Sequence, residues 1–278
     1  MSKPNISLAQ VVSIAGTDPS GGAGIQADIK AISATGSYAA SIITILVAQN
    51  TQSVTAIQKI PLTFIQKQID AVFTDLSITA VKLGMLYHED IIHLVGRNLK
   101  KYQPRYIVLD PVMISQTGHA LLKPEAIHAL VNDLFPLATL ITPNIPEAES
   151  ILKLKITNKA NMEAAAILLA TRYKVSVLLK GGHLNTEHSS DIFYDISEQQ
   201  IHCFETLRIN TLNTHGTGCT LSAAIASYLA QGENLTNAIT KAKHYLTDCI
   251  LAAKDLNLGQ GHGPVHHFYF LDKVAQHV

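Results

Sequence analysis

Short apolar runs alternate with amphipathic helical patterns along most of the chain, and this alternation limits the possible fold more than any other feature. The run "QVVSIAG" (10–16) is followed by a helical pattern over 24–36 that places Ile25, Ile29 and Ile32 on one face. Further buried-strand patterns are "AVKLG" (80–84), "YIVLDPV" (106–112), "ATLITPN" (138–144) and "VSVLLKGG" (175–182), and helical patterns over 63–76, 90–102, 124–135 and 161–173 lie before or between them. Such alternation predicts an α/β fold with a mostly parallel sheet and helices on both faces.

The remaining elements complete this prediction. Further strands are expected at "SIITILVA" (41–48), "VTAIQKI" (54–60), "DIFYDIS" (191–197) and "QIHCFET" (200–206), the last two as an antiparallel pair, with long helices at 216–231 and 234–254. Because no linker, repeat or low-complexity segment interrupts the pattern, residues 1–278 are expected to form a single domain. Ligands of open parallel sheets bind beyond the carboxyl ends of the strands, where we therefore expect the site.

Charge and composition exclude several classes of protein. Lys plus Arg and Asp plus Glu number 21 each, so no basic surface for nucleic acid or anionic lipid is visible. The longest strongly apolar stretch, "AASIITILVA", is too short to span a bilayer, and the first residues lack the apolar core of a secretory signal. Three cysteines without a CxxC pattern, and histidines without zinc-site spacing, favour neither disulfides nor a zinc site. A cytoplasmic protein with reduced cysteines and a small-molecule ligand is expected.

The segment "NTHGTGCT" (213–220) predicts an anion-binding turn. Its glycines open the helix expected at 216–231, where free backbone N–H groups and the positive end of the helix dipole face any ligand. The same position would favour the thiolate of Cys219. The alternative is a plain turn with Cys219 as a small buried residue.

A dinucleotide-binding loop is a competing interpretation of the glycines near the N-terminus. Gly22, Gly24 and Ala27 satisfy the GxGxxA spacing. A dinucleotide-binding loop should follow its strand directly, and an acidic residue should occur about twenty positions later. No Asp or Glu occurs between Asp28 and Asp70, and no GxxxxGK[ST] loop occurs at all. An oxidoreductase and a P-loop protein are therefore both disfavoured.

Phosphoryl transfer from a nucleotide fits the polar residues at the strand ends better. Asp110 of "VLDPVM" and Glu147 of "TPNIPEAE" are oxygen ligands suited to water-mediated Mg²⁺ binding, with Asn144 beside them. Lys180, at the end of "VLLKGG", is placed to meet phosphate, and the N–H groups of 216–219 would form an anion hole. Each residue taken singly could instead shape a turn, cap a helix or end a strand. Together at one sheet edge they indicate a kinase.

Eight segments carry a resemblance to a known family. They are "AGTDPSGGAGIQADIKA", "VAQNTQSV", "VKLGML", "LDPVM", "TPNIPEAE", "LLKGGH", "NTHGTGCTLSAAIA" and "GHGPVHHF". In this order, across nearly the whole chain, they resemble the hydroxymethylpyrimidine/phosphomethylpyrimidine kinases of thiamine biosynthesis, in the ribokinase-like superfamily. The resemblance implies a three-layer ribokinase-like fold, a homodimer, ATP with Mg²⁺, and successive phosphorylation of 4-amino-5-hydroxymethyl-2-methylpyrimidine and its monophosphate.

The resemblance also implies roles for individual residues. Gln49 would hydrogen-bond the pyrimidine edge, since an amide offers both a donor and an acceptor. The other substrate-binding candidates are Ala23, Met85 and Val112 as apolar walls and Asp28 as a residue that arranges the pocket. Candidates for ATP contacts are Asn144, Thr217 and Lys180, those for Mg²⁺ are Asp110 and Glu147, and those for catalysis are Lys180, Gly216, Gly218 and Cys219. Cys219 would occupy the base position, with its pKa lowered by the helix terminus.

Two other functions stay open from the sequence. A pyridoxal kinase would act on another substituted six-membered aza-ring that bears a hydroxymethyl group. A catalytically silent pyrimidine-binding or vitamin-binding protein would keep the pocket without transfer, although the presence of Asp110, Lys180 and Cys219 counts against it.

Overall fold

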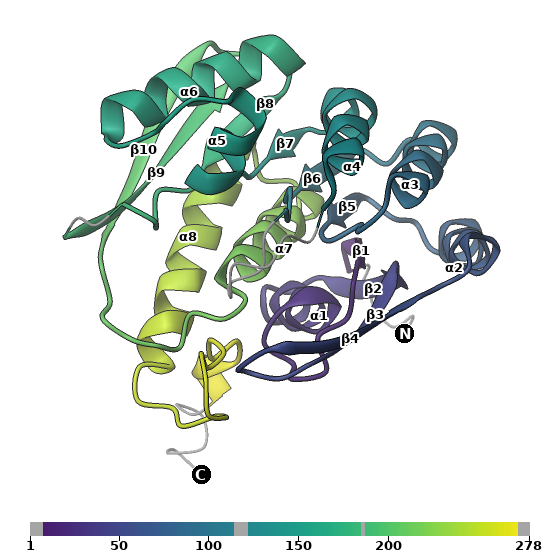
Figure 1. Ribbon diagram of the computed structural model, residues 1–278, viewed down its shortest axis with the longest axis horizontal. Coiled ribbons are helices and arrows are strands. Elements are labelled where there is room, and N and C mark those ends of the chain that lie inside the picture. Colours follow the sequence, from purple (N-terminus) through teal and green to yellow (C-terminus); the bar gives the residue numbers. More distant parts are fainter. Residues whose placement is uncertain (1–7, 114–121, 185–186, 272–278) are drawn as a thin grey trace, which may run out of the picture.

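A twisted eight-stranded sheet forms the centre of the protein in the computed structural model, which describes residues 8–113, 122–184 and 187–271 (Figure 1). The strand order is β10-β9-β8-β7-β6-β5-β1-β2. The strands are β1 (Gln10–Ala15), β2 (Tyr38–Ile43), β5 (Ala80–Leu83), β6 (Tyr106–Leu109), β7 (Leu140–Ile141), β8 (Ser176–Leu179), β9 (His188–Asp195) and β10 (Gln200–Leu207). From β2 to β8 the neighbours are parallel, whereas β9 is antiparallel to both β8 and β10.

Helices cover both faces of this sheet, so the three-layer α/β fold is confirmed. One layer consists of α1 (Gly24–Ala34), α7 (Thr217–Ala230) and α8 (Leu235–Ala252). The other consists of α2 (Leu62–Asp75), α3 (Glu89–Tyr102), α4 (Pro124–Ala129), α5 (Ile145–Leu152) and α6 (Lys159–Tyr173). The helix expected over 124–135 is regular only to Ala129 and continues as a π turn and a 3₁₀ turn to Leu137. No helix among the described residues is long and apolar enough to cross a membrane.

Burial on both faces explains why the strands read as continuous apolar runs. In β1, Val12 and Ile14 belong to the core under α2 and α3, whereas Val11 belongs to the core under α7. All three are at most 1% exposed. Successive side chains of a strand point to opposite faces, so a strand covered on both sides needs apolar residues at consecutive positions.

The single strand expected over 41–48 is wrong, because the chain leaves the main sheet inside it. β2 ends at Ile43, and β3 (Ile45–Gln49) pairs antiparallel with β4 (Val54–Lys59) in a separate two-stranded sheet. Thr44, at the break, is buried, and its hydroxyl donates to the Met85 carbonyl over 2.8 Å. Both pieces are apolar, so the periodicity carries no sign of the change of sheet. The break places Gln49 close to the loop that follows β1, since Thr17 N donates to Ile45 O over 3.1 Å.

Candidate active site

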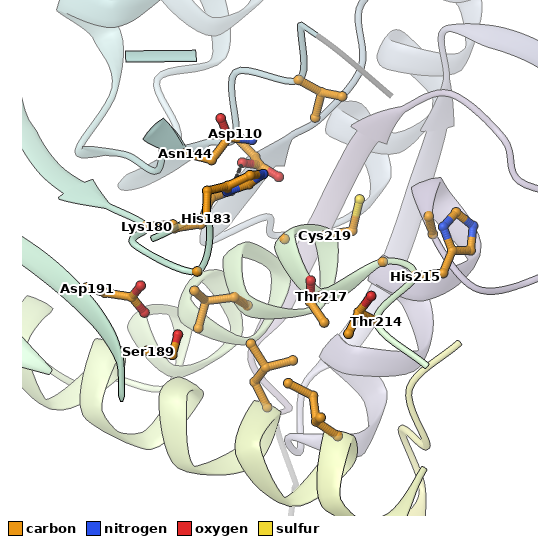
Figure 2. Close-up of a pocket in the computed structure, with 18 of the residues that line it drawn as sticks. Asp110, Asn144, Lys180, His183, Ser189, Asp191, Thr214, His215, Thr217 and Cys219 are labelled. Carbon is orange, nitrogen blue, oxygen red and sulfur yellow. Dashed lines mark hydrogen bonds and ion pairs between the residues drawn. The ribbon is translucent and has the colours of Figure 1, made fainter. Parts of the chain in front are cut away.

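A pocket of about 610 Å³ opens at the carboxyl ends of the parallel strands, in the range of small-molecule sites. It brings together all but one of the site residues expected from the sequence. Those that line it are Ala23, Gln49, Met85, Asp110, Val112, Asn144, Glu147, Lys180, Gly216, Thr217, Gly218 and Cys219. Figure 2 shows Ser189 and Asp191 toward one end and His215 at the other, with Lys180 and Cys219 between them.

The turn before α7 presents backbone N–H groups to the pocket. Gly216 has φ 80°, and a Cβ there would lie 1.8 Å from Gly22 O, so only glycine fits this close approach. The first helical bond, from Thr220 N to Gly216 O, measures 2.9 Å. The N–H groups of Gly218 and Cys219 precede it and remain available for an anion, reinforced by the helix dipole.

An ion pair lies in front of this turn. Lys180 Nζ donates to Asp110 Oδ1 over 2.6 Å, and the two side chains are 14% and 3% exposed. Lys180 follows β8 directly and forms a parallel bridge with Asn144, which follows β7. Adjacent parallel strands therefore deliver the lysine, the amide and the carboxylate to one edge, as the sequence pattern predicts.

Glu147 is held beside this ion pair by the start of α5. Asn144 and Glu147 form a capping box, in which Asn144 N donates to Glu147 Oε2 over 2.8 Å and Glu147 N donates to Asn144 Oδ1 over 2.9 Å. Burial and the Asp110 carboxylate raise the pKa of Glu147 to about 7, against the opposing effect of the Lys180 ammonium.

The oxygen atoms of Asp110 and Glu147 fit a hard divalent cation. The two carboxylates repel each other, and this repulsion contributes to the raised pKa of Glu147. A cation bound by both carboxylates would relieve it. Two carboxylates suffice for Mg²⁺ that keeps several waters and binds nucleotide phosphates. No cluster of three or more His, Cys, Asp or Glu with metal-site geometry occurs in the described part of the chain.

The expectation that the helix terminus lowers the pKa of Cys219 is wrong for the free protein. Burial raises the pKa of this thiol to about 11, although the Lys82 ammonium favours the thiolate. The carboxylates of Asp28 and Asp110 add to the increase. Desolvation of the thiolate outweighs the lowering by the Lys82 ammonium and by the backbone hydrogen bond from Gly24.

Asp28 is the one expected site residue that does not line the pocket. It is fully buried behind the pocket wall, where Lys82 Nζ donates to both of its oxygens over 2.8 Å and Ser13 Oγ donates to it over 2.5 Å. Direct contact with a substrate is therefore excluded in this arrangement. Lys82 itself lines the pocket, so the ion pair joins the buried Asp28 carboxylate to the pocket wall.

Several pocket residues form pairs to which the sequence alone assigns no role. Asp18 and His215 form a pair, 2.7 Å apart, between the loop after β1 and the turn before α7. Lys243 of α8 pairs with Asp191 of β9, which also accepts a hydrogen bond from Gly181 N over 2.9 Å. These partners are far apart in sequence, so local patterns could not reveal them. A charged residue inside an otherwise apolar helical pattern, such as Lys243, is the kind of local sign that points to a buried partner.

The three-layer fold, the glycine turn at the start of α7, and the lysine and carboxylates at the sheet edge are typical of a small-molecule kinase with ribokinase-like architecture. Comparison with known proteins identifies the family within this class. A model of the family described as phosphomethylpyrimidine kinase matches residues 18–266. The chain belongs to this family and is a kinase.

Relatives whose names contain the name of this family align with nearly the whole chain. The chain is 46% identical to the hydroxymethylpyrimidine/phosphomethylpyrimidine kinase of Escherichia coli and 45% identical to that of Rhizobium meliloti, with 93% and 94% of this chain and 97% of each relative covered. It is 46% identical over 95% of its length to the thiamine biosynthesis bifunctional protein of Geobacter sulfurreducens, of which it spans about half, 53%.

Solved structures share the fold. The phosphomethylpyrimidine kinase of Clostridium difficile superposes with a TM-score of 0.77 at 46% identity, covering 87% of this chain and 99% of that one. A pyridoxal kinase of Bacillus subtilis in an ADP complex superposes with a TM-score of 0.86 at 34% identity, covering 95% and 99%.

Proposed function

We propose that this protein transfers phosphate from ATP to 4-amino-5-hydroxymethyl-2-methylpyrimidine and then to the resulting monophosphate, in the synthesis of thiamine diphosphate. One observation carries the proposal: a single pocket is lined by Gln49, by the turn before α7 and by the Lys180–Asp110 pair. The family and the names of the full-length relatives support the same activity.

The pyrimidine occupies the end of the pocket formed by the loop after β1 and by β3. Gln49 reads the ring through its amide, which can donate to a ring nitrogen and accept from the amino group. Ala23, Met85 and Val112 supply apolar walls for the ring faces and the methyl group. This arrangement leaves the hydroxymethyl group directed toward the α7 turn.

The phosphate groups occupy the middle of the pocket. The N–H groups of Gly218 and Cys219 and the Lys180 ammonium stabilise the negative charge of the transferred group. Thr217 and Asn144 contact the nucleotide from either side. Asp110 and Glu147 would hold Mg²⁺, which when bound neutralises phosphate charge.

Cys219 is the proposed proton acceptor for the hydroxymethyl group. A thiol with a pKa of about 11 is mostly protonated at neutral pH, but its small thiolate fraction is a strong base. Lys82 favours that thiolate from the pocket wall, and Asp28, which also accepts a hydrogen bond from Ser13 Oγ, holds Lys82 in place. The proton of the hydroxyl moves to Sγ as its oxygen attacks the γ-phosphorus of ATP and ADP leaves.

We further propose a cytoplasmic homodimer in which residues 1–278 form one catalytic domain. Support for the dimer comes from large apolar side chains exposed around one edge of the molecule. Tyr38, Leu46, Ile57 and Phe64 are 51%, 43%, 37% and 56% exposed, on β2, β3, β4 and α2. An exposed apolar patch of this kind is typical of a protein interface.

A pyridoxal kinase is the second candidate, favoured by the higher TM-scores of solved pyridoxal kinases. The structure of the Staphylococcus aureus pyridoxal kinase with AMP-PCP and pyridoxal superposes with a TM-score of 0.86 at 30% identity, over 95% of both chains. A competition assay decides between the two. With ATP, Mg²⁺ and equal amounts of both rings, the proposal predicts phosphorylation of the pyrimidine with the higher kcat/KM, and preferential phosphorylation of pyridoxal would overturn it.

A further inference from the structure

Asp191, on β9, accepts a hydrogen bond from the residue that follows Lys180. Just beyond the last pair of the β8–β9 ladder, Gly181 N donates to Asp191 Oδ1 over 2.9 Å. A Cβ on Gly181 would lie 2.0 Å from Ser190 O, so only glycine allows the chain to approach β9 this closely. Figure 2 shows Asp191 beside the segment that carries Lys180. The Asp191 side chain thus extends the contact between the two strands as far as the pocket.

The backbone of Lys180 is held by hydrogen bonds on both sides. Its own N–H donates to Pro143 O over 2.8 Å, and the next N–H along the chain, that of Gly181, donates to Asp191. From this fixed backbone the side chain reaches into the pocket and meets Asp110. The position of the Lys180 ammonium therefore depends on both hydrogen bonds.

A lysine from the helix layer of α7 and α8 holds the Asp191 carboxylate in turn. Lys243, on α8, pairs with Oδ2 of Asp191, while Gly181 N uses Oδ1. Asp191 and Lys243 are 4% and 7% exposed, so each compensates the buried charge of the other. A charged carboxylate also binds an N–H more strongly than a neutral acceptor does. The ion pair thus connects α8 to the end of β8.

We propose that Asp191 is a positioning residue for phosphate transfer: through the Gly181 N–H it holds Lys180 where the ammonium meets the transferred phosphate, and Lys243 holds Asp191. This inference rests on the proposed role of Lys180. A misplacement of about 1 Å in a reacting group can cost about 100-fold in rate. Because the Lys180 ammonium stabilises charge that develops in the transition state, its displacement lowers kcat more than it weakens ATP binding.

Two double variants separate the hydrogen bond from the charge. Both contain Lys243→Met, combined with either Asp191→Asn, whose carbonyl still accepts from Gly181 N, or Asp191→Leu, which has no acceptor. Neither combination leaves a buried charge unpaired, so the comparison isolates the acceptor. The double variant with Asp191→Asn is expected to have a kcat about tenfold or more above that of the double variant with Asp191→Leu, with ATP KM values within about threefold of each other.

The same comparison in a Lys180→Met background tests whether Asp191 acts through Lys180. Without the ammonium the acceptor should no longer matter, so the two kcat values should lie within about twofold of each other. A ratio that remains about tenfold would indicate general loosening of the site and overturn the proposal. Equal kcat values with Lys180 present would also overturn it. So would a difference in ATP KM alone, which would assign the pair a direct contact with the nucleotide.

Asp195→Leu is the matched control. Asp195 lies on the same strand, is 5% exposed and accepts from Ser197 N over 2.8 Å, but it is outside the pocket lining. Its loss should lower stability while kcat of the folded enzyme stays within about threefold of wild type. A loss of kcat as large as that caused by removing the acceptor at Asp191 would contradict the proposal.

Hydrogen exchange adds a measurement that needs no variant. In wild-type enzyme the Gly181 N–H should exchange as slowly as the N–H groups of β8, because its acceptor is a buried carboxylate. Exchange at the rate of an exposed N–H would overturn the inference. Asp191→Val, which is suited to a strand, replaces Asp191→Leu if that variant does not fold.

Failure of the proposed function gives a different result from failure of this inference. An impaired Lys180→Met enzyme together with equal kcat values for the two double variants refutes the inference alone. Phosphorylation of pyridoxal but not of the pyrimidine refutes the proposed substrate, and the same comparison with pyridoxal still tests Asp191. Wild-type kcat in Lys180→Met, or activity with neither ring, overturns both.

Discussion

Lys180 Nζ lies 2.6 Å from Asp110 Oδ1, and this pair faces the backbone of Gly218. A Cβ on Gly218 would lie 3.2 Å from Lys180 Nζ and 3.5 Å from Asp110 Oδ2. A side chain at this position would press against both members of the ion pair, so glycine allows the N-terminus of α7 to lie close to them.

Replacing Lys180 with methionine should reduce kcat on the order of 100-fold, because the developing charge on the transferred phosphate loses its cation. The measurement is kcat at saturating ATP and pyrimidine. The matched control is Lys159→Met, which removes an exposed lysine that pairs with Glu205 outside this pocket. A Lys180→Met enzyme that is folded and as active as Lys159→Met would remove Lys180 from the phosphate site.

Removing either proposed metal ligand should raise the Mg²⁺ concentration needed for half-maximal activity. Asp110→Asn and Glu147→Gln each replace a charged oxygen ligand with a neutral amide of similar shape. Titration of activity with Mg²⁺ at fixed ATP measures the change. Asp70→Asn, at an exposed pair with Lys101, is the control and should titrate as wild type. Wild-type titration curves for both ligand variants would contradict the metal assignment.

Much of the site was predictable because it depends on where strands end. Asp110, Asn144 and Lys180 each follow a parallel strand, and parallel strands deliver their carboxyl ends to one edge whatever their exact register. The glycines of the turn before α7 could also be interpreted from the sequence. A close approach of two backbone segments requires glycine, and the glycines are visible in the local sequence.

The sequence did not predict features that depend on how deeply a side chain is buried or on a partner far away in the sequence. The raised pKa of Cys219 results from desolvation and from the charges of Asp28 and Asp110, against the effect of Lys82, and only the packed structure shows these neighbours. Asp28 was expected among the substrate-binding residues as one that arranges the pocket, and the structure places it behind the wall, paired with Lys82. The contact between Asp18 and His215 joins residues 197 positions apart, for which the sequence offers no periodic signal.

The proposed base should leave a signature in the pH profile. With a pKa of about 11, the Cys219 thiolate fraction rises about tenfold per pH unit between pH 7 and 9, and kcat/KM should rise with it. The groups facing this thiol are Lys82, which favours the thiolate, and Asp28 and Asp110, which oppose it.

In Cys219→Ala the backbone donors remain, so ATP and pyrimidine should still bind while kcat falls roughly 10²–10⁴-fold. The rise with pH should also disappear. A folded Cys219→Ala enzyme with kcat within about threefold of wild type would leave the α7 turn as an anion hole without a base.

Folding stability should decrease in mild acid because of His267. This residue is 3% exposed, its Nε2 lies 3.0 Å from Thr220 Oγ1, and burial lowers its pKa to about 4. Between pH 6.5 and 4 the unfolded chain binds a proton that the folded chain excludes, so the free energy of unfolding falls as the pH falls, by up to about 3 kcal/mol.

Urea unfolding at pH 7 and pH 4.5 measures this loss. His267→Gln, which keeps a polar partner for Thr220, should lose less stability than wild type over the same interval. His93→Gln, at an exposed pair with Asp133, should behave as wild type. An equal acid-induced loss in wild type and His267→Gln would assign the effect to other groups.

The central claim is that one site transfers phosphate twice to the same pyrimidine. A time course by mass spectrometry tests it most directly, with purified protein, excess ATP, Mg²⁺ and 4-amino-5-hydroxymethyl-2-methylpyrimidine. The account predicts that the monophosphate appears first and then declines as the diphosphate accumulates, and that Lys180→Met slows both steps. Consumption of ATP without either phosphorylated pyrimidine, or a monophosphate that persists in excess ATP, would contradict it.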